Sequence, residues 1–304
     1  RFDIEKTLAV EEAPQRAGLQ LQTGTGDTQR TETHAVSASS DAAELGPQDL
    51  VVLAVKAPAL KAVVGQIAPL LGPDTIVLTA MNGVPWWFLQ GFGGELQGQL
   101  LKSVDPDGVI GNAIAPRHIL GSVVHASCSV AAPGVIRHGF GNKIIVGEPS
   151  GQRSERALAV AALLAKGGFE APVSEQIQRD IWFKLWGNMT MNPVSAMTGA
   201  TSTQVLDDPL VLAFCGRVML EAKEIGARLG LVIDQQPQDR HVVTRRLGAF
   251  KTSMLQDVES GKPVELDALV SAVRELGQLS GVPTPDTDTL LGLARLHAQV
   301  RGLY

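Results

Sequence analysis

The chain has 304 residues and a net charge of −5, and 44% of its residues are apolar while 19% are charged. This length suffices for two domains of ordinary size, and the composition is typical of a folded globular protein and excludes a disordered one. No block of like charges is present, so we expect neither nucleic acid nor a membrane surface as a partner.

The sequence predicts no targeting segment, no membrane-spanning segment and no metal-binding motif. Residues 1–20 contain four acidic side chains and no apolar core, so we do not interpret them as a signal peptide. The longest apolar stretch, residues 157–165, is far shorter than the ~20 residues that span a bilayer. Cys128 and Cys215 are far apart, without metal or redox spacing. We therefore predict two buried thiols, no metal site and a cytoplasmic protein.

The first half of the chain has the pattern of a parallel α/β sheet. Residues 50–56 and 75–81 are predicted buried strands, residues 57–71 between them have helical spacing, and a turn follows at 82–85. Lys56 and Asn82 stand where these strands end. Because ligands gather at the carboxyl ends of strands in open α/β sheets, both positions are candidate ligand contacts. A surface lysine and a simple Asn-Gly turn are the alternatives.

The pattern then changes twice. Residues 118–148 predict short strands that extend the sheet in antiparallel fashion, and a helix is expected over 153–166. After about residue 175 the periodicity is almost entirely helical, with helices predicted over 211–230, 265–281 and 287–300. We therefore predict an α/β fold with a Rossmann-like first domain, residues 1–172, and an all-helical second domain, residues 173–304.

One helix of the second domain carries an unusual polar stripe. Lys184, Asn188 and Asn192 recur every four residues and share one face of a helix, among apolar neighbours. A solvated face is the ordinary explanation, but the apolar flanks predict burial, and asparagine is a poor residue inside a helix. Pro193 should break or kink the helix there. Two amides beside an ammonium could orient an oxygen-rich ligand.

This stretch resembles the ketopantoate reductases, or 2-dehydropantoate 2-reductases, whose second domain opens with Lys-x3-Asn-x3-Asn-Pro. The segments "TSMLQD" (252–257) and "ELDAL" (265–269) match a second signature of that family, in which Ser253 and Glu265 face one site. The segments "AVKAPAL" and "AMNGVP" match its two strand ends at Lys56 and Asn82. The similarity extends from about residue 17 to the end of the chain.

The resemblance implies NADPH-dependent hydride transfer to a small 2-oxo acid, as in pantothenate biosynthesis. It implies that Lys184 is the general acid and that Glu265 polarises it or touches the nicotinamide ribose. The implied substrate contacts are Asn82, Asn188, Asn192, Ser253 and, by a weak match, Ser202; the implied cofactor contacts are Lys56, Asn82 and Glu265. An ammonium can stabilise the charge that develops on a carbonyl oxygen, and burial lowers a lysine's pKa toward a useful value.

Other interpretations stay open. Ser253 could be only a cap or a first-turn residue, and Glu265 only a solvated acid favoured by the helix dipole. The substrate could be another 2-oxo acid. The protein could also be a different two-domain hydroxyacid dehydrogenase. A homodimer is compatible with the sequence.

The first domain of this family is expected to begin with a strand, a G-x-G-x-x-G loop that binds the dinucleotide and a helix, and this sequence does not show that motif. The glycines at 24–29, 91–98 and 139–141 are predicted to lie in plain turns. Roughly 30 residues of a first βαβ unit are therefore expected to be missing. A catalytically silent relative that binds small acids without a working cofactor cradle is thus the alternative function.

Overall fold

The computed structural model describes residues 18–304, which fall into two compact units. The first unit contains the residues up to Met81 together with Ile110–Ile177, and the second contains Asn82–Val109 together with Gln178–Tyr304. Residues 82–109 thus group with the helical part of the chain, a feature that the sequence pattern does not reveal. None of the helices in residues 18–304 combines the length and apolar composition that a membrane crossing requires.

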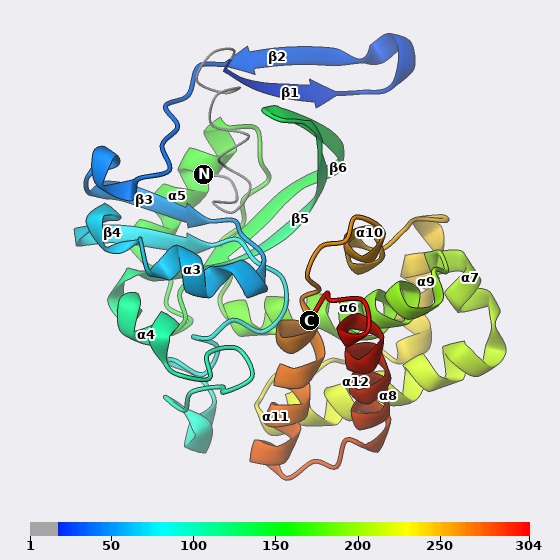
Figure 1. Ribbon diagram of the computed structural model, residues 1–304. Helices are drawn as coiled ribbons and strands as arrows, with labels where there is room; N and C mark the ends of the chain where they lie inside the picture. The colour runs from blue at the N-terminus through cyan, green and yellow to red at the C-terminus, as the bar shows by residue number, and fades with distance from the viewer. Residues whose placement is uncertain (1–17) are drawn as a thin grey trace. The chain divides into compact units, whose positions relative to one another are not determined.

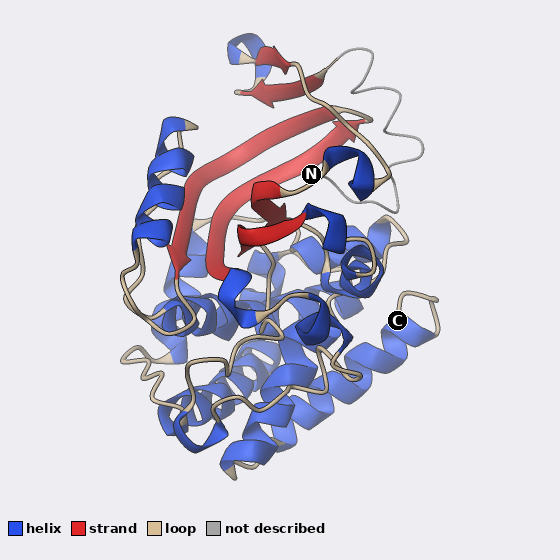
Figure 2. Ribbon diagram, turned by 90° about the vertical axis from the view of Figure 1, so that its left-hand side faces the viewer, coloured by secondary structure: helices blue, strands red, loops and turns tan. Residues whose placement is uncertain are grey.

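A mixed six-stranded sheet in the order β2-β1-β6-β5-β4-β3 forms the centre of the first unit (Figure 1). Its strands are β1 (Leu19–Thr23), β2 (Arg30–His34), β3 (Gln48–Leu53), β4 (Leu71–Thr79), β5 (Ile119–Ala132) and β6 (Val135–Gly147). Strands β3, β4 and β5 are mutually parallel, whereas β5 and β6 form a long antiparallel pair, seen edge to edge in Figure 2. Both the parallel pair and its antiparallel extension are therefore confirmed.

The glycines at 24–29 lie in a turn, as predicted. They join β1 to β2, which pair in antiparallel register, through the short helix η2 (Gly26–Thr28). Two expectations were wrong. Residues 57–71 do not form one helix but three short pieces, η4 (Ala57–Ala59), α3 (Leu60–Val64) and η5 (Ala68–Leu70). Gly65 and Pro69 interrupt the pattern, because glycine weakens a helix and proline cannot donate to it.

The second wrong expectation concerns the cysteines. Cys215 is buried, but Cys128 is exposed on the outer half of β5, where neighbouring Val130 is 67% exposed. The β5–β6 pair is longer than the part of the sheet that α5 (Glu155–Lys166) covers, so the outer half of β5 lacks that cover.

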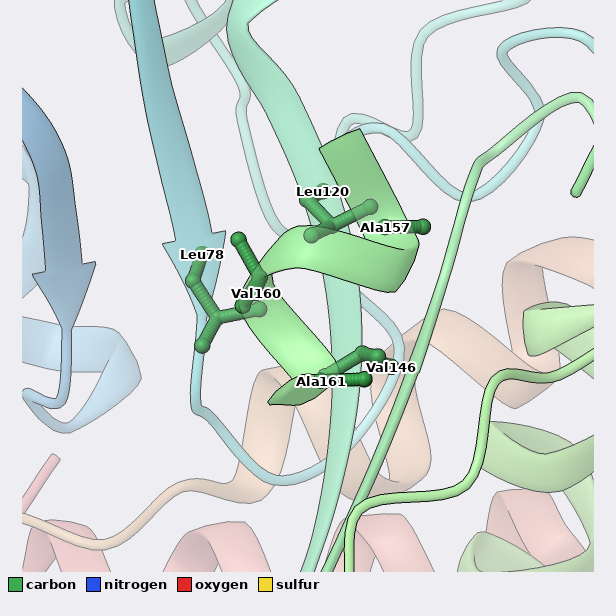
Figure 3. Close-up of a cluster of buried hydrophobic side chains, with 6 residues drawn as sticks. All are labelled: Leu78, Leu120, Val146, Ala157, Val160 and Ala161. Atoms are coloured by element: carbon green, nitrogen blue, oxygen red, sulfur yellow. The ribbon is translucent and has the colours of Figure 1, made fainter. Parts of the chain in front are cut away.

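Helix α5 closes one face of the sheet. Its N-cap is Ser154, whose Oγ accepts from the Ala157 N–H at 3.1 Å. Small and branched side chains of α5 then pack on three strands, as Figure 3 shows: Ala157, Val160 and Ala161 against Leu78, Leu120 and Val146. This apolar layer fixes the sheet whose strand ends carry the candidate ligand contacts.

Helices make up most of the second unit. They are α6 (Ile177–Thr198, whose first residue belongs to the first unit), α7 (Ser202–Asp207), α8 (Pro209–Arg228), α9 (Pro237–Arg246), α10 (Ser253–Glu259), α11 (Ala272–Ser280) and α12 (Pro285–Gln299). The short helices α4 (Val109–Ala113), η6 (Gly94–Leu96) and η7 (Pro116–His118) lie between β4 and β5 in sequence. The predicted helix over 265–281 instead begins with a π-helical turn, η8 (Asp267–Ser271), and continues as α11.

Helix α6 is anchored in the second unit by its tryptophans. The indole N–H of Trp182 donates to the Ala222 carbonyl at 3.2 Å, and that of Trp186 donates to the Met219 carbonyl at 2.7 Å. Both acceptors belong to α8. Phe88, from the segment 82–109, packs on Trp182 with ring centroids 6.0 Å apart. These buried aromatic contacts make α6 a rigid support for the polar side chains that it carries.

Candidate active site

The polar stripe lies on α6 as the sequence predicts. Lys184 and Asn188 are half-buried and Asn192 is buried, so the stripe is not a solvated face. Of the two predicted effects of Pro193, a break is excluded, because α6 continues through it to Thr198. Proline has no N–H, so the Met189 carbonyl, one turn earlier, lacks its usual helical hydrogen bond beside the stripe.

Lys184 meets a side chain from the turn after β4. Its Nζ donates to Oδ1 of Asn82 at 2.7 Å, and the two residues are 102 positions apart. Burial lowers the pKa of Lys184 from its ordinary value to about 8, and the carboxylate of Glu265 opposes that shift by attraction. The structure thus brings together three predicted residues, Lys184, Asn82 and Glu265, all in the second unit.

The segment that follows Glu265 holds the Asn82 turn in place. Glu265 is buried just before the π-helical turn η8. The Val84 N–H donates to the Ala268 carbonyl at 2.8 Å. Gly83, which lies between Asn82 and Val84 in the sequence, has φ +81°. A Cβ on Gly83 would lie 2.5 Å from that carbonyl oxygen. Only glycine allows this approach, so the "NG" dipeptide is a docking point rather than just a turn.

At the other end of the stripe, Asn192 meets α10. Its Nδ2 donates to Oγ of Ser253 at 3.4 Å, and Ser253 is exposed. The N-cap of α10 is Thr252, whose side chain accepts from the Leu255 N–H at 3.2 Å. The cap interpretation of Ser253 is therefore wrong: it is a first-turn residue whose hydroxyl lies beside the stripe.

The Ser202 hydroxyl makes its hydrogen bonds outside this set, and Lys56 belongs to the other unit. Ser202 is fully buried; its Oγ donates to the Gly248 carbonyl at 2.8 Å and accepts from the Phe250 N–H at 3.1 Å. Both roles of its hydroxyl are thus used by the loop before α10, and we leave Ser202 out of the site. Lys56 belongs to the first unit, where it is half-buried at the N-cap position of η4.

Two features of the site carry no sequence signal that reasoning could have used. The hydrogen bond from Lys184 to Asn82 joins two segments that are far apart in the sequence and share no motif. The residues of the π-helical turn after Glu265 have a pattern that an ordinary α-helix would also show.

Chemically, the arrangement provides a proton donor and an anion-tolerant surface. A lysine with a pKa near 8 is protonated at neutral pH and still releases its proton readily. The amides on this face of α6 and the Ser253 hydroxyl on α10 can hold the oxygens of a small polar molecule. Together they suit an oxygen atom that gains negative charge during a reaction and then takes up a proton.

Comparisons with known proteins identify the family of this chain. Two family models match this chain: "Ketopantoate reductase PanE/ApbA" over residues 6–151 and "Ketopantoate reductase PanE/ApbA C terminal" over residues 176–298. A 2-dehydropantoate 2-reductase from Mesorhizobium japonicum is 49% identical over 269 residues, which cover 88% of this chain and 82% of the relative.

Solved structures share the fold. That of a candidate ketopantoate reductase from Ralstonia solanacearum MolK2 is 59% identical, with a TM-score of 0.92, and the match covers 97% of this chain and 89% of the other. A D-mandelate dehydrogenase solved with NADH and anilino(oxo)acetate is 19% identical with a TM-score of 0.79, covering 96% and 88%. At that identity the likeness concerns the fold alone.

Proposed function

The chain belongs to the ketopantoate reductase family, and from that premise we propose that it reduces a small 2-oxo acid of the 2-dehydropantoate type with NADPH, using Lys184 as the general acid. The family's members are oxidoreductases, so the reaction class follows from membership. The observation that carries the assignment of Lys184 is its position: a half-buried ammonium, with a pKa of about 8, bonded to Asn82 and attracted by Glu265.

The proposed roles follow the geometry of the second unit. Lys184 donates its proton to the carbonyl oxygen as that oxygen becomes an alkoxide, which leaves a neutral amine on the enzyme and a hydroxyl on the product. The Asn82 amide oxygen holds the ammonium in position at 2.7 Å, and Glu265 favours its charged form. Asn188, Asn192 and Ser253 bind the remaining oxygens of the acid.

The cofactor would supply the hydride that the carbonyl carbon accepts. Residues 18–304 contain no strand that leads through a glycine-rich loop into a helix, since the glycines at 24–29 lie in the β1–β2 turn and those at 139–141 inside β6. These residues do not fit a pyrophosphate cradle, and we assign the pyrophosphate to none of them. Lys56, just after β3, is the proposed cofactor contact in the first unit, while Asn82 and Glu265 are the proposed contacts in the second.

The proposal also covers the partner, the cellular location and the oligomeric state of the enzyme. A small-molecule acid is the partner that the site chemistry favours, and a cytoplasmic homodimer is the form we propose for the working enzyme.

The test is turnover of 2-dehydropantoate with NADPH, followed by the loss of the reduced nicotinamide absorbance. We expect activity in the unmodified chain and a fall of about 10²–10⁴-fold in kcat for Lys184→Ala, the usual contribution of a general acid. Lys166→Ala, which removes an exposed lysine at the end of α5, is the matched control and should leave kcat unchanged. Unchanged turnover in Lys184→Ala would sink the assignment, and acid binding without turnover in the unmodified chain would favour the silent relative.

A further inference from the structure

The π-helical turn η8 changes the hydrogen-bond register of its helix. The Leu269 N–H donates to the Glu265 carbonyl, four residues back, as in an α-helix. The Ala272 N–H donates to the Asp267 carbonyl, five residues back. In an uninterrupted α-helix it would donate to the Ala268 carbonyl instead. The π-helical register thus releases the Ala268 carbonyl from that bond, and the turn after β4 donates to it.

The segment that follows α12 contacts the chain on both sides of Glu265. The Tyr304 hydroxyl donates to Oδ1 of Asp267 at 2.7 Å, although the two residues are 37 positions apart. The Leu303 carbonyl accepts from the Val264 N–H at 3.1 Å, and the Leu303 side chain is buried. Val264 directly precedes Glu265, and Asp267 follows it by two residues. Residues 303 and 304 therefore fix the backbone before Glu265 and the side chain that begins the π-helical turn.

The end of α12 fixes this segment in turn. The Leu303 N–H donates to the Ala298 carbonyl at 2.9 Å, and Gly302 just before it has φ +67°. A glycine in the left-handed conformation is a common way for a chain to turn at the end of a helix. Partial burial and the bond to Asp267 raise the pKa of Tyr304 to about 12. The Tyr304 hydroxyl therefore keeps its proton and remains a donor at neutral pH.

The Asp267 carboxylate joins the Tyr304 phenol to both ends of the π-helical turn. Asp267 is the first residue of η8, and its Oδ1 also accepts from Oγ of Ser271, the last residue, at 2.8 Å. Arg295 is a further charged group near the phenol, and its attraction favours the ionised form. Hydrogen bonds to an ionised carboxylate are stronger than those between neutral groups. Two such donors on one oxygen tie the turn to residue 304 and hold its two ends together.

We infer that Tyr304 is a positioning residue of the reductase site, whose hydroxyl holds η8 in the register that places Glu265 and frees the Ala268 carbonyl for the turn carrying Asn82. This inference rests on the proposed function. Tyr304 acts through Glu265 and Asn82, the two residues that act on the Lys184 ammonium. Without the hydroxyl, the α-helical register would compete, and in that register the Ala268 carbonyl is used within the helix.

The test is Tyr304→Phe, which removes only the hydroxyl. A less well placed Glu265 attracts the Lys184 ammonium less, so the alkaline loss of kcat should move to lower pH, as in Glu265→Gln but less far. The kcat for 2-dehydropantoate should also fall by about 10-fold, part of the loss that a misplaced reacting group causes. Arg274→Gln breaks an exposed 2.8 Å pair between α11 and Asp288 of α12, and this matched control should change neither quantity.

A double variant tests whether Tyr304 acts through Glu265. Tyr304→Phe combined with Glu265→Gln should move the alkaline loss of kcat no further than Glu265→Gln alone. A further shift as large as in the single variant would overturn the inference. A Tyr304→Phe protein with a lower melting temperature but an unchanged kcat and pH profile would also overturn it, because the bond to Asp267 would then serve stability alone.

A measurement without turnover separates this inference from the proposed function. The pKa of Lys184 is followed by NMR in lysine-labelled protein, and Lys184→Ala identifies its signal. A lower pKa of Lys184 in Tyr304→Phe, and not in Arg274→Gln, supports the inference, whereas an unchanged pKa would overturn it. Failure of the unmodified chain to reduce any 2-oxo acid would instead contradict the proposed function, and the NMR result would still show whether Tyr304 positions Glu265.

Discussion

The Lys184 ammonium is subject to two opposing influences that can be separated by substitution. Burial favours the neutral amine, whereas the carboxylate of Glu265 favours the ammonium, and the result is a pKa of about 8. The protonated form is the proton donor, so activity should be present below this pKa and be lost as the pH rises through about 8.

The first prediction concerns Glu265→Gln. Removing the carboxylate removes the attraction that holds the proton, so the pKa of Lys184 should fall further and the alkaline loss of kcat should move to lower pH. A pH profile of kcat measures the shift. Glu224→Gln, on the exposed side of α8, should not move it.

Asn82→Asp provides a change of opposite sign at the same ammonium. It places a carboxylate where the amide oxygen accepts from Lys184 at 2.7 Å, so the pKa should rise and the alkaline limb should move to higher pH. If both variants moved the limb in the same direction, Lys184 could not be the group that titrates.

The second prediction contrasts two serines that the family resemblance implies as substrate contacts, Ser253 by a signature and Ser202 by a weak match. Ser202→Ala leaves the Gly248 carbonyl and the Phe250 N–H without their partner, and it should lower the free energy of unfolding by about 1–3 kcal/mol. Ser253→Ala removes an exposed hydroxyl beside Asn192, so stability should change by less than about 0.5 kcal/mol while KM for the oxo acid rises. Denaturant unfolding and steady-state kinetics measure the two effects, and the reverse pattern would restore Ser202 to the site.

At the scale of elements, the turn after β4 and the π-helical turn η8 act as one support for the site. The Val84 N–H bonds to the Ala268 carbonyl, which fixes the backbone on either side of Gly83 and hence the position of Asn82. A π-helical turn widens a helix by one residue per turn, and such turns are frequent at functional sites. Here it follows Glu265 and supplies the carbonyl on which the turn docks.

The third prediction tests this support with two glycines that have the same φ angle. Gly83 and Gly98 both have φ +81°, but a Cβ at Gly83 would lie 2.5 Å from the Ala268 carbonyl oxygen, whereas a Cβ at Gly98 would meet nothing within 4 Å. Gly98→Ala should therefore cost only the strain of the left-handed conformation, about 1–2 kcal/mol. Gly83→Ala should in addition displace Asn82 and lower kcat by about 10²-fold, as small misplacements of reacting groups do.

Steady-state kinetics and thermal melting of the two variants decide between them. Equal losses of activity at equal losses of stability would show that Gly83 is needed only for its backbone conformation.

At the scale of the whole molecule, the parts that sequence reasoning predicts are those encoded by local spacing. Lys184, Asn188 and Asn192 recur every four residues on a single helix, so their shared face follows from helix geometry alone. The parallel strands β3 and β4 likewise follow from apolar runs joined by short segments.

What could not be predicted depends on contacts between distant segments. The structural role of Ser202 arises from a loop 46–48 residues later, and the Lys184–Asn82 bond joins residues 102 positions apart.

The last prediction concerns cofactor binding by the intact chain, because the residues on which it depends belong to different parts of the sequence. NADPH and NADH are each titrated against the 304-residue protein while nicotinamide fluorescence is followed. We expect NADPH to bind more tightly than NADH. Bound NADPH should also raise the melting temperature, since a ligand at 100 times its Kd stabilises the folded state by about 2.7 kcal/mol. Lys56→Ala should weaken NADPH binding, because it removes a cation after β3, where ligands meet such sheets. Lys184→Ala should leave it unchanged, because that lysine is assigned to the oxo acid. Equal affinity for both dinucleotides would contradict the NADPH assignment, and weaker binding in Lys184→Ala but not in Lys56→Ala would exchange the roles of the two lysines.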